Sequence, residues 1–226
     1  MNLLAVETST ELCSVALLRG DELFVEEVLA ENRHSELLVP MIRKVLERAR
    51  LAPTHMDAFA FGQGPGSFTG IRIACGIIQG LAFAAQRPVV PVPSLLALAE
   101  QTHERRVLAA LDARMDEAYL AAYARNGDDW DEVVAPRLVG AGSLPDLPAR
   151  GWTATGNGFV RLPWLREAYR ERVEMRLDGD LPRAGAVARI AARRFARGAA
   201  IAAELAAPLY LRDKVAQTTE ERRARR

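Results

Sequence analysis

Cysteine, aromatic residues and net charge are all scarce in this 226-residue sequence. Its two cysteines, Cys13 and Cys75, lie in apolar settings and form no Cys-x-x-Cys pair, a usage typical of small buried side chains in a reducing compartment. Aromatic residues make up 6% of the chain and hydrophobic residues 50%, which predicts a soluble globular protein. Thirty Lys and Arg against 29 Asp and Glu leave no overall field that would by itself attract nucleic acid or an anionic membrane.

Long hydrophobic runs are missing too. The longest apolar stretch, 71–85, is interrupted by Arg72 and by two glycines, and it is shorter than the roughly 20 residues that a membrane span needs. The N-terminus becomes acidic at Glu7 and has no basic segment before an apolar one, so we expect no signal peptide. The sequence therefore predicts a cytoplasmic protein without membrane contact, of one domain or two modest lobes.

The near balance of charge hides a difference between the two ends of the chain. Up to residue 160 there are 14 Lys and Arg and 20 Asp and Glu, whereas beyond it there are 16 and 9. The basic last third, which ends in Arg-Arg-Ala-Arg-Arg, could contact the phosphates of a nucleic acid. A solvated arginine-rich helix followed by a mobile tail over 218–226 explains the same charges, and the sequence leaves both interpretations open.

Hydrophobic periodicity predicts an alternation of strands and helices. We expect strands over 3–6, 13–18, 22–30, 56–61, 88–92, 107–111, 118–123 and 133–139, and a further strand from Trp152. We expect helices from Ser35, over 68–85, from Ser94 and over 184–199. The first three strands are separated only by turn residues and so form an antiparallel meander. The whole order predicts a mixed sheet with covering helices.

A glycine-rich loop joins the strand over 56–61 to the helix over 68–85, with the sequence Gly62-Gln63-Gly64-Pro65-Gly66-Ser67-Phe68-Thr69-Gly70. Glycines in this place let backbone N–H groups approach an anion at the helix N-terminus. The loop lacks the Lys-Ser/Thr pair of a P-loop and the spacing of Gly-x-Gly-x-x-Gly. Two interpretations stay equally open: an anion-binding loop, or a tight turn in which Ser67 or Thr69 caps the helix.

The helix after this loop is apolar nearly all round and carries Gly76 and Gly80 four residues apart. A helix of this kind must be covered on more than one side. Its glycines remove side chains from one stripe and let another backbone approach closely. The helix is either a core element packed on its own sheet, or one of its faces contacts a second polypeptide, because exposed apolar faces usually mark interfaces.

Catalytic and metal-binding patterns are poor. The three histidines lack metal-ligand spacing and lie beside expected element boundaries, so we predict no metal site: His34, His55 and His103. Asp112 and Asp116 have the i, i+4 spacing of a carboxylate pair. Arg114 and Glu117 beside them favour a salt-bridged turn over acid–base chemistry.

Four segments, in order along the chain, match one known family. They are Leu4-Ala5-Val6-Glu7-Thr8-Ser9-Thr10-Glu11-Leu12-Cys13-Ser14-Val15-Ala16-Leu17, Gly62-Gln63-Gly64-Pro65-Gly66-Ser67-Phe68-Thr69-Gly70-Ile71-Arg72-Ile73, Asp112-Ala113-Arg114-Met115-Asp116-Glu117 and Pro208-Leu209-Tyr210-Leu211-Arg212. Together they resemble the TsaB (YeaZ) family, and the string Gly-Pro-Gly-Ser-Phe-Thr-Gly is the most specific part. The resemblance spans nearly the whole chain and is weak only over about 125–205.

The resemblance implies an α/β protein with an actin-like (ASKHA) ATPase fold, in which two related lobes have mixed sheets and covering helices. The first lobe is expected over 1–103 and the second, smaller and more divergent with the basic tail, over 104–226. The implied role is to help place a threonylcarbamoyl group on the adenosine beside the anticodon of tRNAs that read codons beginning with A. In this family the chain is a non-catalytic scaffold or activator of the TsaD catalytic subunit, and a TsaE ATPase completes the complex.

Comparison with the resembled TsaD chains favours the non-catalytic role. TsaD-like chains carry a His-x-x-x-His metal pair, whose places fall near Ser94 and Leu98 here, so that both ligands are lost. The first phosphate turn of actin-like ATPases usually offers Asp, and Glu7 stands there instead. We expect no cofactor and no metal. The corresponding loops are expected to be vestigial phosphate loops, with residues Glu7, Thr8, Ser9, Gly64, Gly66 and Ser67.

The resemblance also implies a partner interface on the two long helices of the first lobe. The expected contact residues are Leu38, Met41, Ile42, Val45, Ile73, Gly76, Ile77, Gly80 and Leu81. The same surface is expected to close a homodimer when TsaD is absent, and a contact with tRNA would be indirect. The alternative is an enzyme in its own right, either an actin-like ATPase or a glycoprotease-like peptidase.

Overall fold

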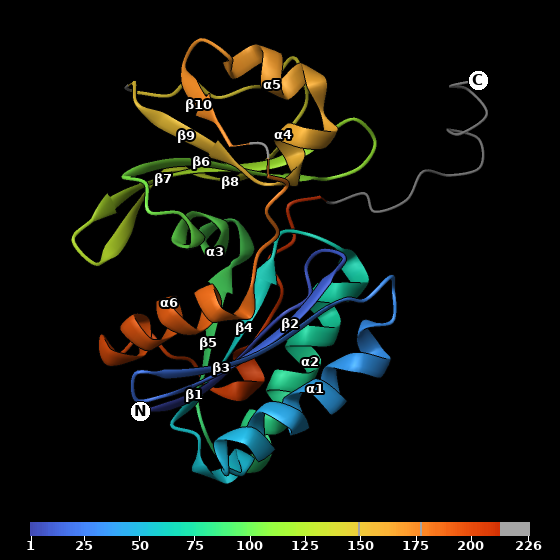
Figure 1. Ribbon diagram of the computed structural model, residues 1–226, viewed down its shortest axis with the longest axis vertical. Coiled ribbons are helices and arrows are strands. Elements are labelled where there is room, and N and C mark those ends of the chain that lie inside the picture. The colour runs from blue at the N-terminus through green and yellow to red at the C-terminus, as the bar shows by residue number, and fades with distance from the viewer. Residues whose placement is uncertain (149, 177, 213–226) are drawn as a thin grey trace.

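The chain forms two lobes, each built on a five-stranded sheet, in a computed structural model that describes residues 1–148, 150–176 and 178–212 (Figure 1). The first sheet contains β1 (Asn2–Glu7), β2 (Leu12–Arg19), β3 (Glu22–Leu29), β4 (Ala58–Gly64) and β5 (Val89–Pro93). The second contains β6 (Arg106–Asp112), β7 (Ala118–Asn126), β8 (Asp129–Val139), β9 (Trp152–Thr155) and β10 (Val173–Met175). The helices are α1 (His34–Ala49), α2 (Phe68–Ala85), α3 (Ser94–Gln101), α4 (Asn157–Arg161), α5 (Pro163–Tyr169) and α6 (Ala184–Ala196).

The two sheets repeat one topology. Their strand orders are β3-β2-β1-β4-β5 and β10-β9-β6-β7-β8. In each sheet three consecutive strands pair antiparallel, and the next two strands add in parallel on the open side of the first. This repetition confirms the expected α/β fold with two related lobes. The expected strands and helices are all present, and α4, α5 and β10 lie in the stretch where the sequence shows no clear pattern.

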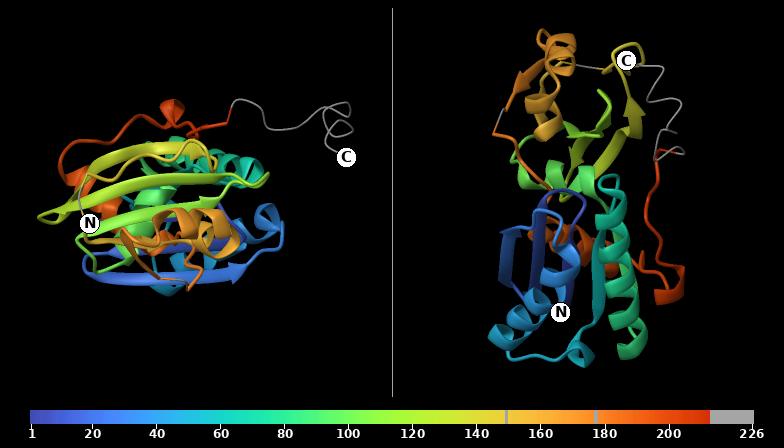
Figure 2. Two further views of the ribbon diagram at one scale, coloured as in Figure 1. Left: turned by 90° about the horizontal axis from the view of Figure 1, so that it is seen from above. Right: turned by 90° about the vertical axis from the view of Figure 1, so that its right-hand side faces the viewer.

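The elements stack in five layers. α1 and α2 cover the outer face of the first sheet, α3 and α6 lie between the sheets, and α4 and α5 cover the outer face of the second sheet (Figures 1 and 2). One apolar core, which includes Leu3, Val107 and Val187, joins the inner faces of both sheets through the middle layer. Because the lobes share this core, they pack as one unit.

The last part of the chain returns to the first lobe. α6 lies within the expected range of the second lobe, 104–226, but it packs against β1, β2, β4 and β5 of the first sheet. The segment after α6 then runs along α2, where Gln79 Nε2 donates to Ala203 O at 3.1 Å. Further on it reaches the end of β4, where Leu209 N donates to Gln63 O at 2.7 Å. The tail expected to be mobile, 218–226, lies outside the described residues.

The start and the packing of α2 follow from its sequence. Ser67 Oγ accepts a hydrogen bond from Gly70 N at 3.3 Å and so caps the helix, as one of the two expected capping residues. By length and composition alone α2 could cross a membrane. Its inner face, however, packs on β4 and is part of the core under the first sheet, as in a core helix of a globular protein.

Candidate functional site

One long face of α2 is open to solvent, and we call it the α2 face. Gly76 and Gly80 are exposed, and a Cβ placed on either would meet no atom within 4 Å. Phe83, one turn further on, is 71% exposed. Half-buried apolar side chains flank these positions: Ile73, Ile77 and Leu81. No charged residue occurs between Arg72 and Arg87, so the α2 face is an apolar surface that no described part of the chain covers.

The α1 side chains expected at the interface lie in the core instead. All four are buried: Leu38, Met41, Ile42 and Val45. Their spacing defines the apolar stripe of an amphipathic helix, and this stripe faces the helix's own sheet. The outer side of α1 carries Val39, Arg43 and Lys44. The α1 residues of the expected contact set therefore lie in the core of the first lobe, whereas the α2 residues are exposed or half-exposed, and the interface itself stays a prediction.

An arginine that stacks on one aromatic ring and contacts a second marks the N-terminal end of the α2 face. The Arg72 guanidinium lies 3.5 Å from the centroid of the Phe68 ring, and its Nε donates to Tyr210 Oη at 2.6 Å. Arginine and aromatic side chains of this kind carry much of the binding energy in protein interfaces. Sequence reasoning missed this cluster, because only the fold brings Tyr210 to α2. It also missed Phe83, which helical spacing from Gly80 could have placed on the same face.

At the floor of the cleft between the lobes, the glycine loop closes against the turn between β1 and β2. Ser67 N donates to Ser9 O at 2.7 Å, and Thr8 Oγ1 donates to Gly70 O at 2.8 Å. A Cβ on Gly66 would lie 2.3 Å from Ser9 O, and one on Gly70 would lie 2.0 Å from Thr8 O. The glycines thus let the chain's own turn approach, which favours the tight-turn interpretation of the loop.

Glu7 ends β1 beneath these loops and is fully buried. Its Oε1 accepts from Ser9 N at 2.7 Å and its Oε2 accepts from Ser94 Oγ at 2.8 Å. Burial raises the pKa of Glu7, while hydrogen bonds from Ser9, Ser94 and Thr8 act in the opposite direction. Ser94 and Leu98, near which the resemblance predicted the places of the TsaD metal pair, are both fully buried, and Ser94 Oγ donates to Glu7.

The equivalent position in the second lobe is open. Asp112 ends β6 as Glu7 ends β1, and Arg114 N donates to Asp112 Oδ1 at 2.8 Å, just as Ser9 N donates to Glu7. Asp112 Oδ2 lies 3.5 Å from guanidinium nitrogens of Arg114 and of Arg161. It lines a hollow of about 430 Å³ between the lobes. One lobe therefore buries its strand-end carboxyl group, and the other presents it to the cleft.

The turn between β6 and β7 has the salt-bridged character expected from its charges. Asp112 pairs with Arg114, whereas Asp116 accepts a hydrogen bond from Trp164 Nε1 at 2.9 Å. The two carboxylates thus serve different partners. Among the described residues, no group of three or more His, Cys, Asp or Glu could hold a metal ion. His55 accepts from Ala52 N at 3.0 Å within a local turn.

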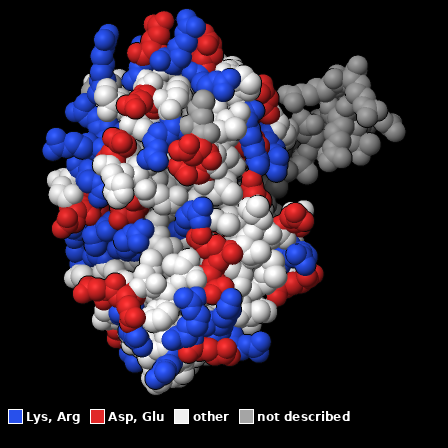
Figure 3. Space-filling model, viewed as in Figure 1, with Lys and Arg blue, Asp and Glu red and all other residues white. Residues whose placement is uncertain are grey.

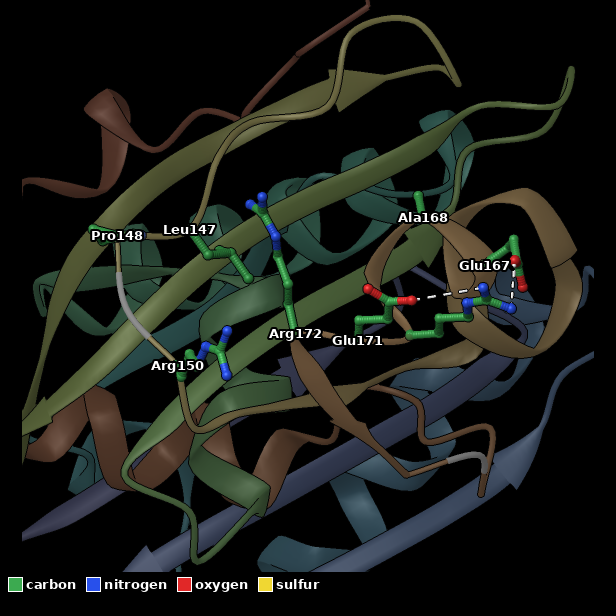
Figure 4. Close-up of a pocket in the computed structure, with 8 residues that line it drawn as sticks. Leu147, Pro148, Arg150, Glu167, Ala168, Glu171 and Arg172 are labelled. Atoms are coloured by element: carbon green, nitrogen blue, oxygen red, sulfur yellow. Dashed lines mark ion pairs between the residues drawn. The ribbon is translucent and has the colours of Figure 1, made fainter.

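A larger hollow, of about 720 Å³, lies at the outer end of the second lobe (Figure 4). It is lined by several arginines and by carboxylates from α5 and the residues that follow it. Arg170 pairs with Glu167 at 2.9 Å and with Glu171 at 3.6 Å, as the dashed lines show. Because charges of both signs lie side by side, this hollow offers no uniformly basic site.

In the part of the chain that the structure describes, the basic last third is partly neutralised by acids from earlier in the sequence. Arginines from beyond residue 160 pair with acids from before it: Arg161 with Glu11, Arg183 with Glu27, Arg193 with Glu100, Arg197 with Asp129, and Arg212 with Glu117. On the face drawn in Figure 3, blue and red are interspersed over both lobes. Over the described residues, these pairs thus link segments that are far apart in the sequence and place charges of opposite sign side by side.

The repeated sheets and the loops that meet at the cleft define a two-lobed protein of the actin-like class. The family model described as "TsaD: tRNA N6-adenosine threonylcarbamoyltransferase" matches residues 27–159. The chain belongs to the TsaB (YeaZ) family, as its four motifs predicted.

Similar proteins support this assignment over the full length. The chain is 37% identical to the tRNA threonylcarbamoyladenosine biosynthesis protein TsaB of Escherichia coli (strain K12), with 96% of each chain covered. It is 36% identical to the protein of the same name from Haemophilus influenzae, with 95% of each covered. Among solved structures, YeaZ from Pseudomonas aeruginosa matches with a TM-score of 0.81 and 38% identity, over 93% of this chain and 99% of that one.

Proposed function

We propose that this chain is a non-catalytic subunit in the biosynthesis of threonylcarbamoyladenosine in tRNA, and that it binds a TsaD-type catalytic subunit through the α2 face. The names of its relatives support the pathway. The observation that carries the partner-binding role is the exposed, uncharged α2 face with Gly76 and Gly80. A continuous apolar surface of this kind is uncommon on a protein that acts alone.

The shape of the α2 face suits another helix. Two glycines four residues apart leave a shallow groove in which a second backbone can lie close to α2. Ile73, Ile77 and Leu81 would then be covered by the partner, which removes apolar surface from water. The Arg72 cluster would give the contact a fixed register, because its guanidinium is already held by two aromatic rings.

In this proposal the TsaD-type partner catalyses the transfer of the threonylcarbamoyl group. Buried Ser94 and Leu98 stand where the resembled TsaD chains carry their metal-binding histidines, and neither side chain can replace an imidazole. In the same proposal a TsaE-type ATPase joins the complex, tRNA contacts this chain only indirectly, and the complex works in the cytoplasm. When TsaD is absent, two copies of the chain associate through the α2 face.

Gly76→Arg tests the interface. The side chain has room in the isolated chain, so the fold is expected to remain, but it places an unpaired charge in the apolar contact. We expect an affinity loss of at least about 30-fold for TsaD, measured by size-exclusion chromatography with light scattering and by calorimetry. Gly142→Arg is the matched control, because Gly142 also has no atom near its Cβ position but lies in the second lobe.

Two further measurements decide between the parts of the proposal. Threonylcarbamoyladenosine content in cells that carry only the Gly76→Arg chain should fall, whereas Gly142→Arg should restore it. Light scattering of the chain alone over a range of concentrations should show that Gly76→Arg is more monomeric than wild type. Full binding of TsaD by Gly76→Arg, with normal modification, would remove the α2 face from the proposal.

A further inference from the structure

The carboxyl group of Glu7 is surrounded by hydrogen-bond donors from three parts of the chain. Ser9 N donates to Oε1 at 2.7 Å, and Ser94 Oγ donates to Oε2 at 2.8 Å. Gly64 N donates at 3.2 Å to the same Ser94 hydroxyl. The Ser9 amide and the Ser94 hydroxyl thus donate directly to one buried carboxyl group. The Gly64 amide acts on it indirectly, through the Ser94 hydroxyl.

Gly62 is necessary for this arrangement. A Cβ on Gly62 would lie 1.9 Å from Glu7 Oε2, in the space that the carboxyl group occupies. The glycine loop above it is likewise closed by the chain, because Ser67 N donates to Ser9 O. Amides from a strand end and a glycine loop are the donors that proteins use for phosphate and carboxylate oxygens. Here the oxygens belong to the chain itself.

We propose that Glu7 is an internal ligand: its carboxyl group fills a carboxyl-binding position at the floor of the interlobe cleft, and formic acid or its anion enters this position when the Glu7 side chain is removed. The filled position closes the floor of the first lobe without any external ligand. The open hollow begins above it, between Ser9 and Asp112. The proposal does not depend on the proposed partner-binding function.

Comparison with the second lobe supports the assignment. Asp112 accepts the equivalent amide hydrogen bond from Arg114 N, yet its second oxygen lies 3.5 Å from guanidinium nitrogens of Arg114 and of Arg161 at the edge of the hollow. The longer side chain of Glu7 instead reaches Ser94 on α3. The side chain with the additional methylene group, Glu7, is therefore enclosed by the first lobe, whereas the shorter Asp112 lines the hollow.

Glu7→Ala is the direct test. We expect the midpoint of thermal unfolding to be lower than in wild type, and to rise by about 3 °C in formate at roughly tenfold excess over its Kd, relative to chloride at equal ionic strength. Wild type should show no such rise. Leu4→Ala is the matched control, because it leaves a buried apolar cavity on the same strand without these donors and should not respond to formate.

A second variant keeps the cavity closed. Glu7→Leu has a similar size but accepts no hydrogen bond, so that the Ser9 amide and the Ser94 hydroxyl lose their acceptor. We expect its folding equilibrium constant to fall about tenfold or more, without a response to formate. If Glu7→Ala is unfolded in chloride, refolding in formate should restore the near-ultraviolet circular dichroism of wild type. Wild-type stability of Glu7→Leu, or the absence of any formate effect on Glu7→Ala, would overturn the proposal.

Discussion

The two lobes share one sheet topology but differ in what covers the outer faces. The outer helices of the first lobe, α1 and α2, have 16 and 18 residues, whereas α4 and α5 on the second lobe have 5 and 7. In the first lobe a helix connects β3 to β4, but the corresponding connection from β8 to β9 contains no helix in its described residues. The sheets therefore preserve the duplication, and the outer helices give each lobe its own surface.

The lobes differ in a second way, at the cleft. Glu7 is sealed under the glycine loop and hydrogen-bonded to Ser94, whereas Asp112 faces the hollow and pairs with arginines. The two equivalent carboxyl groups thus differ in their surroundings: Glu7 is fully buried, whereas the Asp112 side chain is 9% exposed and lines the hollow. The stability of each lobe can depend on its own contacts or on the core that both lobes share, and substitutions in one lobe distinguish the two cases.

The largest loss of stability is expected when a large buried side chain is truncated in the apolar core beneath the outer helices of either lobe. Phe59 lies under α1 and α2, Phe159 lies in the outer core of the second lobe, and both are fully buried. Phe59→Ala or Phe159→Ala should each cost about 3–5 kcal/mol. Because one core joins both sheets, calorimetry should show a single unfolding transition at a lower temperature in either variant. Two separate transitions, of which each variant shifts only one, would show that the lobes unfold independently.

Two glycines of α2 should respond to alanine in opposite directions. A Cβ on Gly70 would lie 2.0 Å from Thr8 O, so Gly70→Ala should destabilise the fold by about 1–3 kcal/mol. Gly76→Ala meets no atom within 4 Å and should stabilise the isolated chain by about 0.5–1 kcal/mol. Urea unfolding of both variants measures the difference. Equal losses would mean that Gly76 also serves packing within the lobe.

Two acids of the first lobe should give opposite pH dependences. The folded pKa of Glu7 is raised from the ordinary value of 4.5 by burial, so its contribution to stability is full below that pH and is lost as pH rises through the folded value. The pKa of Glu26 is lowered, first by its hydrogen bond from Lys44, so its contribution is present above 4.5 and is lost as pH falls through the folded value.

Denaturation at several pH values tests this pair of predictions. Relative to Glu7→Gln, wild type should become less stable as pH rises above 4.5, whereas relative to Glu26→Gln it should become less stable as pH falls below it. The Glu26 effect should be the smaller one, because its ion pairs with Lys44 and Arg48 are partly exposed. A Glu7→Gln variant that follows wild type at every pH would contradict the raised pKa.

The smallest effect is expected at the ion pairs between the lobes. Arg161 from α4 lies 2.5 Å from Glu11 and 3.5 Å from Asp112, and more than a third of its side chain is exposed to solvent. Arg161→Ala should therefore cost at most about 1 kcal/mol, and the difference should shrink at high salt. A loss that is larger, or independent of salt, would show that these charges and not the shared core hold the lobes together.

Much of the fold could be predicted from the sequence, because its signals are local. Alternating apolar runs placed the strands, and Ser67 marked the start of α2. The spacing of Leu38 and Val45 predicted α1 correctly but not which side of the helix faces outward, since an apolar stripe fits a sheet as well as a partner. The short elements α4, α5 and β10 carry too few residues for a periodic signal.

The candidate site was predicted in part for the same reason. The α2 glycines could be singled out because an apolar helix with a small-residue stripe is unusual in itself. The partners of Glu7 and Arg72 could not, because Ser94 and Tyr210 lie 87 and 138 positions away along the chain. The contacts of α6 with the first sheet could not be predicted either, since its own sequence does not specify which sheet it covers.

By itself the sequence determined the family, the order of strands and helices, and the presence of a glycine loop with an over-apolar helix after it. Only the tertiary structure decided that Thr8, Ser9 and Glu7 pack against the glycines of the loop, and that several described arginines beyond residue 160 pair with acids from before it. The physical reason is the separation along the sequence over which each interaction acts. Backbone conformation and amphipathicity act between near neighbours, whereas burial, ion pairing and hydrogen bonding depend on which distant segments meet.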